Sequence, residues 1–157
     1  MSDVQVVGPG DGEVVELGAA RIRVIEDGSA TAHRLGIVEI TLAPHAEGPA
    51  QHRHARHDEG FYVVSGTARF TVGPTAYDAP PGALAMVPPG VPHGFANPGD
   101  EPLVMINTFT PDFYVGYFRD LRDAIADGRA ATAEGVGEVM ARYDTALAGE
   151  FAPGGDA

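Results

Sequence analysis

The chain contains no cysteine and no lysine, because all 10 of its basic residues are arginine. Without cysteine it can form no disulfide framework, no thiolate nucleophile and no thiolate-bound zinc or iron–sulfur cluster. Without lysine, Schiff-base chemistry on a lysine amine is excluded. Any metal ion bound by this protein must therefore be held by histidine and carboxylate side chains.

Positive charge and long apolar runs are also scarce. The chain has 22 acidic and 10 basic residues, and its formal net charge of −12 repels phosphate backbones and anionic membrane surfaces. No stretch approaches the ~20 apolar residues that span a bilayer, and the N-terminal MSDVQVVGPG lacks the basic start and apolar run of a secretion signal. We expect a soluble, cytoplasmic protein that binds neither nucleic acid nor membrane.

The composition is that of one globular domain, with 157 residues, 44% hydrophobic and 20% charged. Glycine and proline separate short apolar runs at intervals of about ten residues, which is typical of an all-β sandwich or barrel. Several runs alternate apolar and polar residues with period two, as in 68–72. The sequence predicts strands over residues 13–17, 21–26, 35–42, 61–65, 68–72, 83–87 and 103–109.

The pattern changes after Pro111. Asp112 can cap a helix, and apolar residues recur at helical spacing over roughly 112–127. Thr132 is a second candidate cap, followed by an apolar stripe that stops at Gly149. We therefore predict a β-barrel over 1–111, a helical extension over 112–149 that packs on the barrel or on a second subunit, and a disordered tail over 150–157.

Histidines are concentrated in the middle of the chain. His52 and His54 are two residues apart, so on a strand they point to the same face and can reach one ion. Glu59 follows at an odd offset, so the chain must bend between His54 and Glu59 if all three are to converge. After Glu59, the alternation places Phe61 and Val63 inward, on the side of the carboxylate.

A second segment, 82–97, supplies a further candidate ligand. Gly82 begins a short strand, and Pro88-Pro89-Gly90 forces a tight turn because proline fixes φ and glycine permits positive φ. His93 then opens the returning strand and can supply a fourth ligand. Three imidazoles and one carboxylate suit Fe, Mn, Co, Ni, Cu or Zn, and the order of affinities alone does not choose among them.

The two segments resemble the paired motifs of the cupin superfamily. The first, G-x5-H-x-H-x3,4-E-x6-G, is matched by His52, His54, Glu59 and Gly66, with Ala46 in place of the opening glycine. The second, G-x5-P-x-G-x2-H-x3-N, is matched by Gly82, Pro88, Gly90, His93 and Asn97. The resemblance implies a double-stranded β-helix, or jelly-roll, barrel. It also implies one divalent transition metal ion ligated through His52, His54, Glu59 and His93.

Residues 59–66 and the helical tail that begins with Phe113 and Tyr114 are similar to single-domain quercetin dioxygenase-like cupins. That resemblance implies a metal-dependent dioxygenase acting with O2 on a small hydroxy-carbonyl, phenolic or enediol-like substrate, flavonols included. Glu59 would then also be the catalytic proton acceptor. Two alternatives remain open: a non-oxidative metal-dependent isomerase, lyase or cyclase, and a cupin that binds a small ligand without catalysis. Cupins commonly pair through their outer strands, so we expect a homodimer.

The remaining candidates have simpler expected roles. We expect Phe61, Val63 and Phe95 to line the cavity above the ion and to contact substrate. His57 lies in the predicted turn and is expected at the surface, the alternative being a further metal ligand or a proton relay. The single residues His33 and His45 are also expected at the surface. Asn97 is expected to organise the backbone and Arg53 to point outward. The C-terminal aromatic residues Tyr114, Tyr117 and Phe118 are expected in the core or in an interface.

Overall fold

The computed structural model describes residues 3–148. The strands are β1 (Glu13–Leu17), β2 (Ala20–Asp27), β3 (Gly36–Leu42), β4 (His52–His54), β5 (Asp58–Ser65), β6 (Ala68–Val72), β7 (Thr75–Ala79), β8 (Leu84–Val87), β9 (Gly94–Ala96), β10 (Leu103–Thr110) and β11 (Thr145–Leu147). The helices are the short 3-10 segments η1 (Asp112–Tyr114) and η2 (Arg129–Ala131), with α1 (Val115–Ala126) and α2 (Ala133–Ala141). The predicted disordered tail, 150–157, lies outside the described residues.

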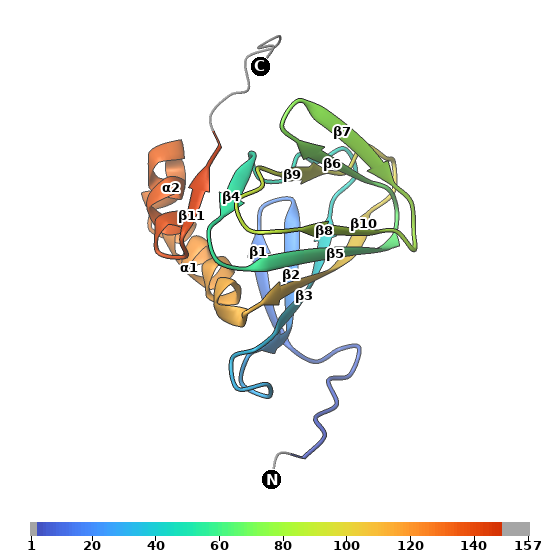
Figure 1. The fold of residues 1–157 in the computed structure, drawn as a ribbon, viewed down its shortest axis with the longest axis vertical. Helices are drawn as coiled ribbons and strands as arrows, with labels where there is room; N and C mark the ends of the chain where they lie inside the picture. The colour runs from blue at the N-terminus through green and yellow to red at the C-terminus, as the bar shows by residue number, and fades with distance from the viewer. Residues whose placement is uncertain (1–2, 149–157) are drawn as a thin grey trace.

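The strands form antiparallel sheets arranged as a jelly-roll (Figure 1). One sheet has the order β1-β2-β3-β10-β5-β8, a second has the order β7-β6-β9, and a third joins β11 to β4. Strands far apart in sequence are neighbours in these sheets, as β3 and β10 are. The predicted all-β, double-stranded β-helix fold is therefore confirmed.

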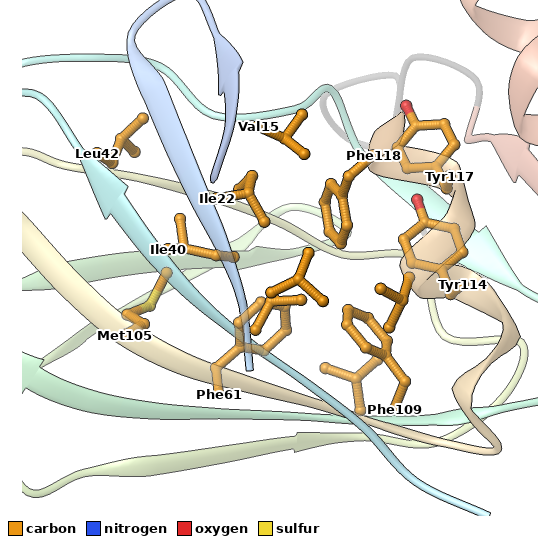
Figure 2. Packing of buried hydrophobic residues seen from close by; sticks show 14 of the residues in the cluster. Val15, Ile22, Ile40, Leu42, Phe61, Met105, Phe109, Tyr114, Tyr117 and Phe118 are labelled. Atoms are coloured by element: carbon orange, nitrogen blue, oxygen red, sulfur yellow. The ribbon is translucent and has the colours of Figure 1, made fainter. Parts of the chain in front are cut away.

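Alternation along the strands builds one core between the sheets. On β3 the burial alternates strictly, so that Val38, Ile40 and Leu42 face inward. Ile22 from β2 and Phe61 from β5 project into the same space (Figure 2). Burying a side chain of this size stabilises a fold by about 1.5–3 kcal/mol, so the period of two along the strands places the apolar residues where they stabilise the barrel.

All seven predicted strands are present, and the bounds predicted for β1 and β6 agree with the structure. The returning strand predicted after His93 is β9, whereas sequence patterns missed β7 and β11. Strand β7 is exposed along nearly its whole length, so it carries no inward apolar period. Strand β11 is only three residues long, which is too short for a periodic signal.

The C-terminal helices lie together on one side of the barrel, with β11 beside β4 (Figure 1). Thr132 caps α2 as predicted, accepting a hydrogen bond from the Gly135 amide at 3.1 Å. Asp112 does not cap a helix. Its carboxylate lies 3.0 Å from Nδ1 of His33 instead.

The predicted second helix was too long. Helix α2 ends at Ala141, Asp144 adopts a positive φ of 48°, and the chain then runs along β4 as β11. An open strand edge offers unpaired backbone hydrogen-bonding groups, so tertiary pairing overrides the helical spacing of the last apolar residues. Within residues 3–148 no helix combines the length and the apolar character needed to cross a membrane.

Candidate metal centre

Strand β4 and the bend after it place the first three candidate ligands. His52 and His54 are buried while Arg53 between them is exposed, as the period of two requires. The chain bends at residues 55–57, and β5 begins at Asp58, which turns Glu59 inward. The predicted bend between His54 and Glu59 is therefore confirmed.

The turn before His93 is hydrogen-bonded directly to β4. Gly90 has a φ of 85°, and its amide donates to the His54 carbonyl at 2.7 Å. His52 and His93 exchange two backbone hydrogen bonds, of 3.0 and 2.9 Å. These bonds hold the imidazoles of His52 and His93 with their ring centroids 4.6 Å apart.

The four candidate ligands converge at one buried point. One ligand atom from each of His52, His54, Glu59 and His93 can be chosen so that all lie within 4.8 Å of one another. Nε2 of His54 and Nε2 of His93 lie 2.8 and 2.9 Å from the same carboxylate oxygen, Oε2 of Glu59. The sequence motifs and the tertiary structure thus select the same cluster, which is compatible with binding a metal ion.

The opposite nitrogen of each ring faces a hydrogen-bond acceptor. Nδ1 of His52 lies 2.8 Å from the Ala50 carbonyl, and Nδ1 of His93 lies 2.9 Å from the Val91 carbonyl. Nδ1 of His54 lies 2.8 Å from Oγ1 of Thr145, a hydroxyl that donates its own proton to a backbone carbonyl. Each Nδ1 must therefore donate, which leaves Nε2 as the lone-pair position of a neutral ring.

This donor set fits a cation. If the rings are neutral, the Nε2 lone pairs of His54 and His93 face the Glu59 carboxylate, and only a positive charge between them makes that arrangement favourable. Protons can take that place only if the imidazoles become charged. A divalent metal ion satisfies all four groups at once, and imidazole with carboxylate is a donor set that transition metals accept.

Burial and charge set the protonation of the cluster. Burial, together with the neighbouring His93, lowers the pKa of His52 to about 4, so this ring is neutral at pH 7. Burial favours the neutral form of Glu59, but hydrogen bonds from His54 and His93 outweigh it and hold its pKa below the ordinary value. Burial likewise lowers the pKa of His93, and the contact with Glu59 raises it more. The carboxylate is therefore ionised.

Sequence reasoning missed two residues that support the ligands. Asn107 donates from Nδ2 to Oε1 of Glu59 at 3.1 Å and to the Gly60 carbonyl at 2.9 Å. It occupies a buried position of β10 between Met105 and Phe109, so a polar residue in an inward register was the available signal. Thr145 on β11 had no such signal, because its role depends on a strand pairing across 91 positions.

The expectation that His57 lies at the surface was wrong. It is 1% exposed, and within the described residues neither ring nitrogen has a hydrogen-bond partner. Its ring lies 4.1 Å from that of His54, and aromatic rings of Phe109 and Tyr114 surround it. The bend that contains His57 is thus packed against the C-terminal aromatic residues. Burial lowers the pKa of His57 to about 4.

A cavity of about 250 Å³ opens beside the ligands. Phe95 lines it, as expected, whereas Phe61 and Val63 are fully buried in the core and are not among its lining residues. The walls are mostly apolar. They comprise Leu17, Ala19, Ala20, Ile22, Ile40, Leu42, Glu47, Gly48, Pro49, His52, Glu59, Phe95, Asn107, Tyr114, Tyr117, Phe118 and Leu121.

The other sequence candidates lie outside the cluster. His33 contacts Asp112, and His45 contacts Asp100 at 2.7 Å. Asn97 organises the backbone, as expected, by donating to three carbonyl groups.

Comparisons with known proteins agree with this fold. Residues 38–109 match a family model described as "Cupin domain". The chain is similar to the polyketide cyclase RemF from Streptomyces resistomycificus, with a TM-score of 0.62 and 18% identity over 74% of this chain and 94% of that one. For KdgF from Halomonas sp. the TM-score is 0.60 and the identity 19%, over 68% and 94% of the two chains. An RmlC-like cupin from Shewanella frigidimarina NCIMB 400 has a TM-score of 0.56 and 27% identity, over 71% and 95%.

The antiparallel jelly-roll agrees with the family match: residues 38–109 are similar to a cupin domain. Within that domain lie all four candidate metal ligands. The expected membership of the cupin superfamily is thus supported. The finer resemblance to quercetin dioxygenase-like cupins stays a prediction, and no curated protein matches the sequence.

Proposed function

We propose that this protein is a metal-dependent dioxygenase of small-molecule metabolism. Its substrate would be a small chelating compound with a hydroxy-carbonyl, phenolic or enediol group, and the ion would be Fe, Ni, Co, Mn, Cu or Zn. The observation that carries the proposal is the convergence of three Nε2 atoms and one carboxylate beside a mostly apolar cavity. Four protein ligands leave coordination positions for substrate on an ion that prefers five or six.

The chain's own residues would prepare the site in three ways. His52, His54, Glu59 and His93 would hold the ion. The hydrogen bonds that the three histidines make through Nδ1 would keep each Nε2 turned toward it. A bound divalent ion would act as a Lewis acid that lowers the pKa of the substrate hydroxyl. Glu59 would accept that proton, and Asn107 would keep the second carboxylate oxygen in place. Apolar walls such as Phe95 and Phe118 would exclude water.

A second candidate is a non-oxidative isomerase, lyase or cyclase. The position of Glu59 supports it, because the carboxylate lines the cavity, where it would accept a proton from a carbon next to a carbonyl group. Binding of a small ligand without catalysis is the third candidate. Oxygen consumption distinguishes the dioxygenase from the non-oxidative enzyme. A dioxygenase consumes O2 with each turnover, and an isomerase, lyase or cyclase does not.

The test begins with elemental analysis of the purified protein and reconstitution with each candidate metal. Oxygen uptake is then measured against a panel of phenolic, hydroxy-carbonyl and enediol compounds. We expect uptake with the loaded wild type and its loss in Glu59→Gln, while the exposed control Glu16→Gln keeps it. Substrate turnover under strict anaerobic conditions would contradict a dioxygenase and support the second candidate. Full turnover by Glu59→Gln would contradict Glu59 as the base.

We also propose that the protein is a homodimer formed through its outer strands. Strand β8 is at one end of the large sheet, and beside β5 it leaves Tyr62, Leu84 and Met86 exposed at 47%, 61% and 57%. Exposed apolar patches of this kind mark protein interfaces. Sedimentation equilibrium should give twice the monomer mass, and a monomer at micromolar concentration would contradict the proposal.

A further inference from the structure

Three tyrosines form a cluster between the C-terminal helices and the cavity. The rings of Tyr114 and Tyr117 are stacked, with centroids 4.7 Å apart and an interplanar angle of 19°. Tyr143 meets them edge-on at 6.1 and 5.9 Å. Figure 2 shows the hydroxyl oxygens of Tyr114 and Tyr117 turned to the same side of the stacked rings. The two phenols thus present a pair of polar groups in one direction.

The hydroxyls of these tyrosines differ in their hydrogen bonds. The Tyr143 hydroxyl donates to Oδ2 of Asp120 at 2.6 Å. Tyr114 and Tyr117 are only 3% and 5% exposed, yet within residues 3–148 neither hydroxyl has a hydrogen-bond partner. A buried tyrosine hydroxyl usually has one. Since both residues line the cavity, the missing partner is expected inside it.

Packing alone does not explain these hydroxyls. The aromatic neighbours Phe109 and Phe118 contact Tyr114 with centroids 5.3 and 5.8 Å away, and both are plain hydrocarbon rings. A phenylalanine at position 114 or 117 would fill the same space without a hydroxyl. Within the described residues the fully buried side-chain atoms without a partner are the two ring nitrogens of His57, so the Tyr114 and Tyr117 oxygens keep some accessible surface. Both residues line the cavity, so the two hydroxyls fit a site that is completed by a ligand.

The same cavity contains the candidate metal ligands. The ring of Tyr114 meets that of His54 edge-on, with centroids 4.5 Å apart. His52 and Glu59 line the cavity together with Tyr114 and Tyr117. A molecule that reaches the ion-binding atoms therefore lies in the same cavity as Tyr114 and Tyr117.

The charge and size of the cavity limit what it accepts. None of its lining residues is an arginine, and its acidic members are Glu47 and Glu59. A phosphate or sulfate group would be desolvated there with no side-chain cation to compensate for it. The volume of about 250 Å³ lies below the ~300–1,000 Å³ of pockets for drug-sized ligands. These properties favour a compact, mostly apolar substrate.

We propose that Tyr114 and Tyr117 are substrate-binding residues, whose hydroxyls donate hydrogen bonds to an oxygen of a mono- or bicyclic substrate without a phosphate group. The inference rests on the proposed function, because it assumes that the substrate also reaches the ion held by His52, His54, Glu59 and His93. It narrows the substrate class to compact cyclic hydroxy-carbonyl or phenolic compounds and disfavours sugar phosphates.

The test measures binding rather than turnover. Wild-type protein is loaded with Co²⁺, whose visible absorption reports the ligands around the ion, and is titrated calorimetrically with tropolone, maltol, catechol and glucose 6-phosphate. The tightest of the first three is then titrated into Tyr114→Phe and Tyr117→Phe, with Tyr143→Phe as the matched control. Each of the first two variants should bind it about 3- to 10-fold more weakly. Tyr143→Phe should bind it as the wild type does, and Co²⁺ content should be unchanged in all three.

The outcomes separate this inference from the proposed function. Equal affinity of Tyr114→Phe, Tyr117→Phe and wild type, with Co²⁺ bound, would overturn the role of the hydroxyls and leave the metal site intact. Tighter binding of glucose 6-phosphate than of the cyclic compounds would overturn the substrate class. If wild type takes up no more Co²⁺ than a His52→Ala variant, the metal site fails, and the inference fails with it.

Discussion

Nδ1 of His54 and Oγ1 of Thr145 lie 2.8 Å apart, although 91 positions separate the two residues in the chain. The contact exists because β11 pairs with β4, in a register that sets Thr145 opposite His54. The Thr145 hydroxyl donates to the Tyr143 carbonyl, so its oxygen accepts from His54. The C-terminal extension thus orients a candidate metal ligand in the barrel.

Replacing Thr145 with valine should weaken metal binding by about 10- to 100-fold, because the acceptor that orients His54 is removed while the shape is kept. Competition with a chromophoric chelator measures the affinity. Thr145→Ser keeps the hydroxyl and should stay close to wild type. Equal affinity of the valine variant and wild type would show that the contact does not support the ligand.

Asn107→Leu should destabilise the fold by about 1–3 kcal/mol, because the Gly60 carbonyl and one oxygen of Glu59 would lose their buried donor. Urea unfolding of the metal-free protein measures the free energy. Thr108→Val, the next residue along β10 on the half-buried face, serves as the control and should change stability by only about 0.5 kcal/mol. Similar losses in the two variants would argue against a specific role for Asn107.

Metal loading should raise the melting temperature. A ligand that binds only the folded state at 100 times its Kd stabilises it by about 2.7 kcal/mol, which corresponds to a shift of roughly 5–10 °C at this chain length. A chelator should reverse the shift. His52→Ala should abolish it, whereas His45→Ala, on an exposed residue that pairs with Asp100, should retain it. A shift that persists in His52→Ala would place the ion elsewhere.

The pair formed by His33 and Asp112 should make stability depend on pH. The hydrogen bond and charge of Asp112, with a smaller contribution from Asp27, raise the pKa of His33 above 6.5. A raised pKa in the folded state stabilises the protein fully below about pH 6.5. That stabilisation is lost as the pH rises through the raised value.

Urea unfolding of wild type and His33→Gln at several pH values tests this dependence. The difference between them should be largest at acidic pH and should shrink toward alkaline pH. It should also be small, because the His33 side chain is 82% exposed and surface pairs contribute little. A difference that grows with pH would contradict the assignment.

Local patterns predicted much of this molecule because they depend on neighbouring residues alone. Burial alternates along β3 and β10 as the apolar period predicts, and β4 turns both of its histidines inward. The turn at Pro88-Pro89-Gly90 follows from the φ limits of proline and glycine. These features could be predicted from the sequence without any knowledge of the fold.

Features that depend on contacts between distant segments could not be predicted from local sequence patterns. His57 was predicted at the surface because its neighbours are polar, and it is buried because aromatic residues more than fifty positions away cover it. Helical spacing extended α2 too far, since the spacing carries no information about the free edge of β4. The apolar residues Phe61 and Val63 face inward as predicted but do not line the cavity.

The sequence by itself determined the antiparallel strands, the donor types and the residues that carry them, because side-chain chemistry and the period of two are local properties. Only the tertiary structure decided which nitrogen of each imidazole is directed at the shared point, which residues hold it there, and which tyrosines line the cavity. Those features depend on hydrogen bonds and packing between segments such as β4 and β11, whose pairing no local pattern encodes.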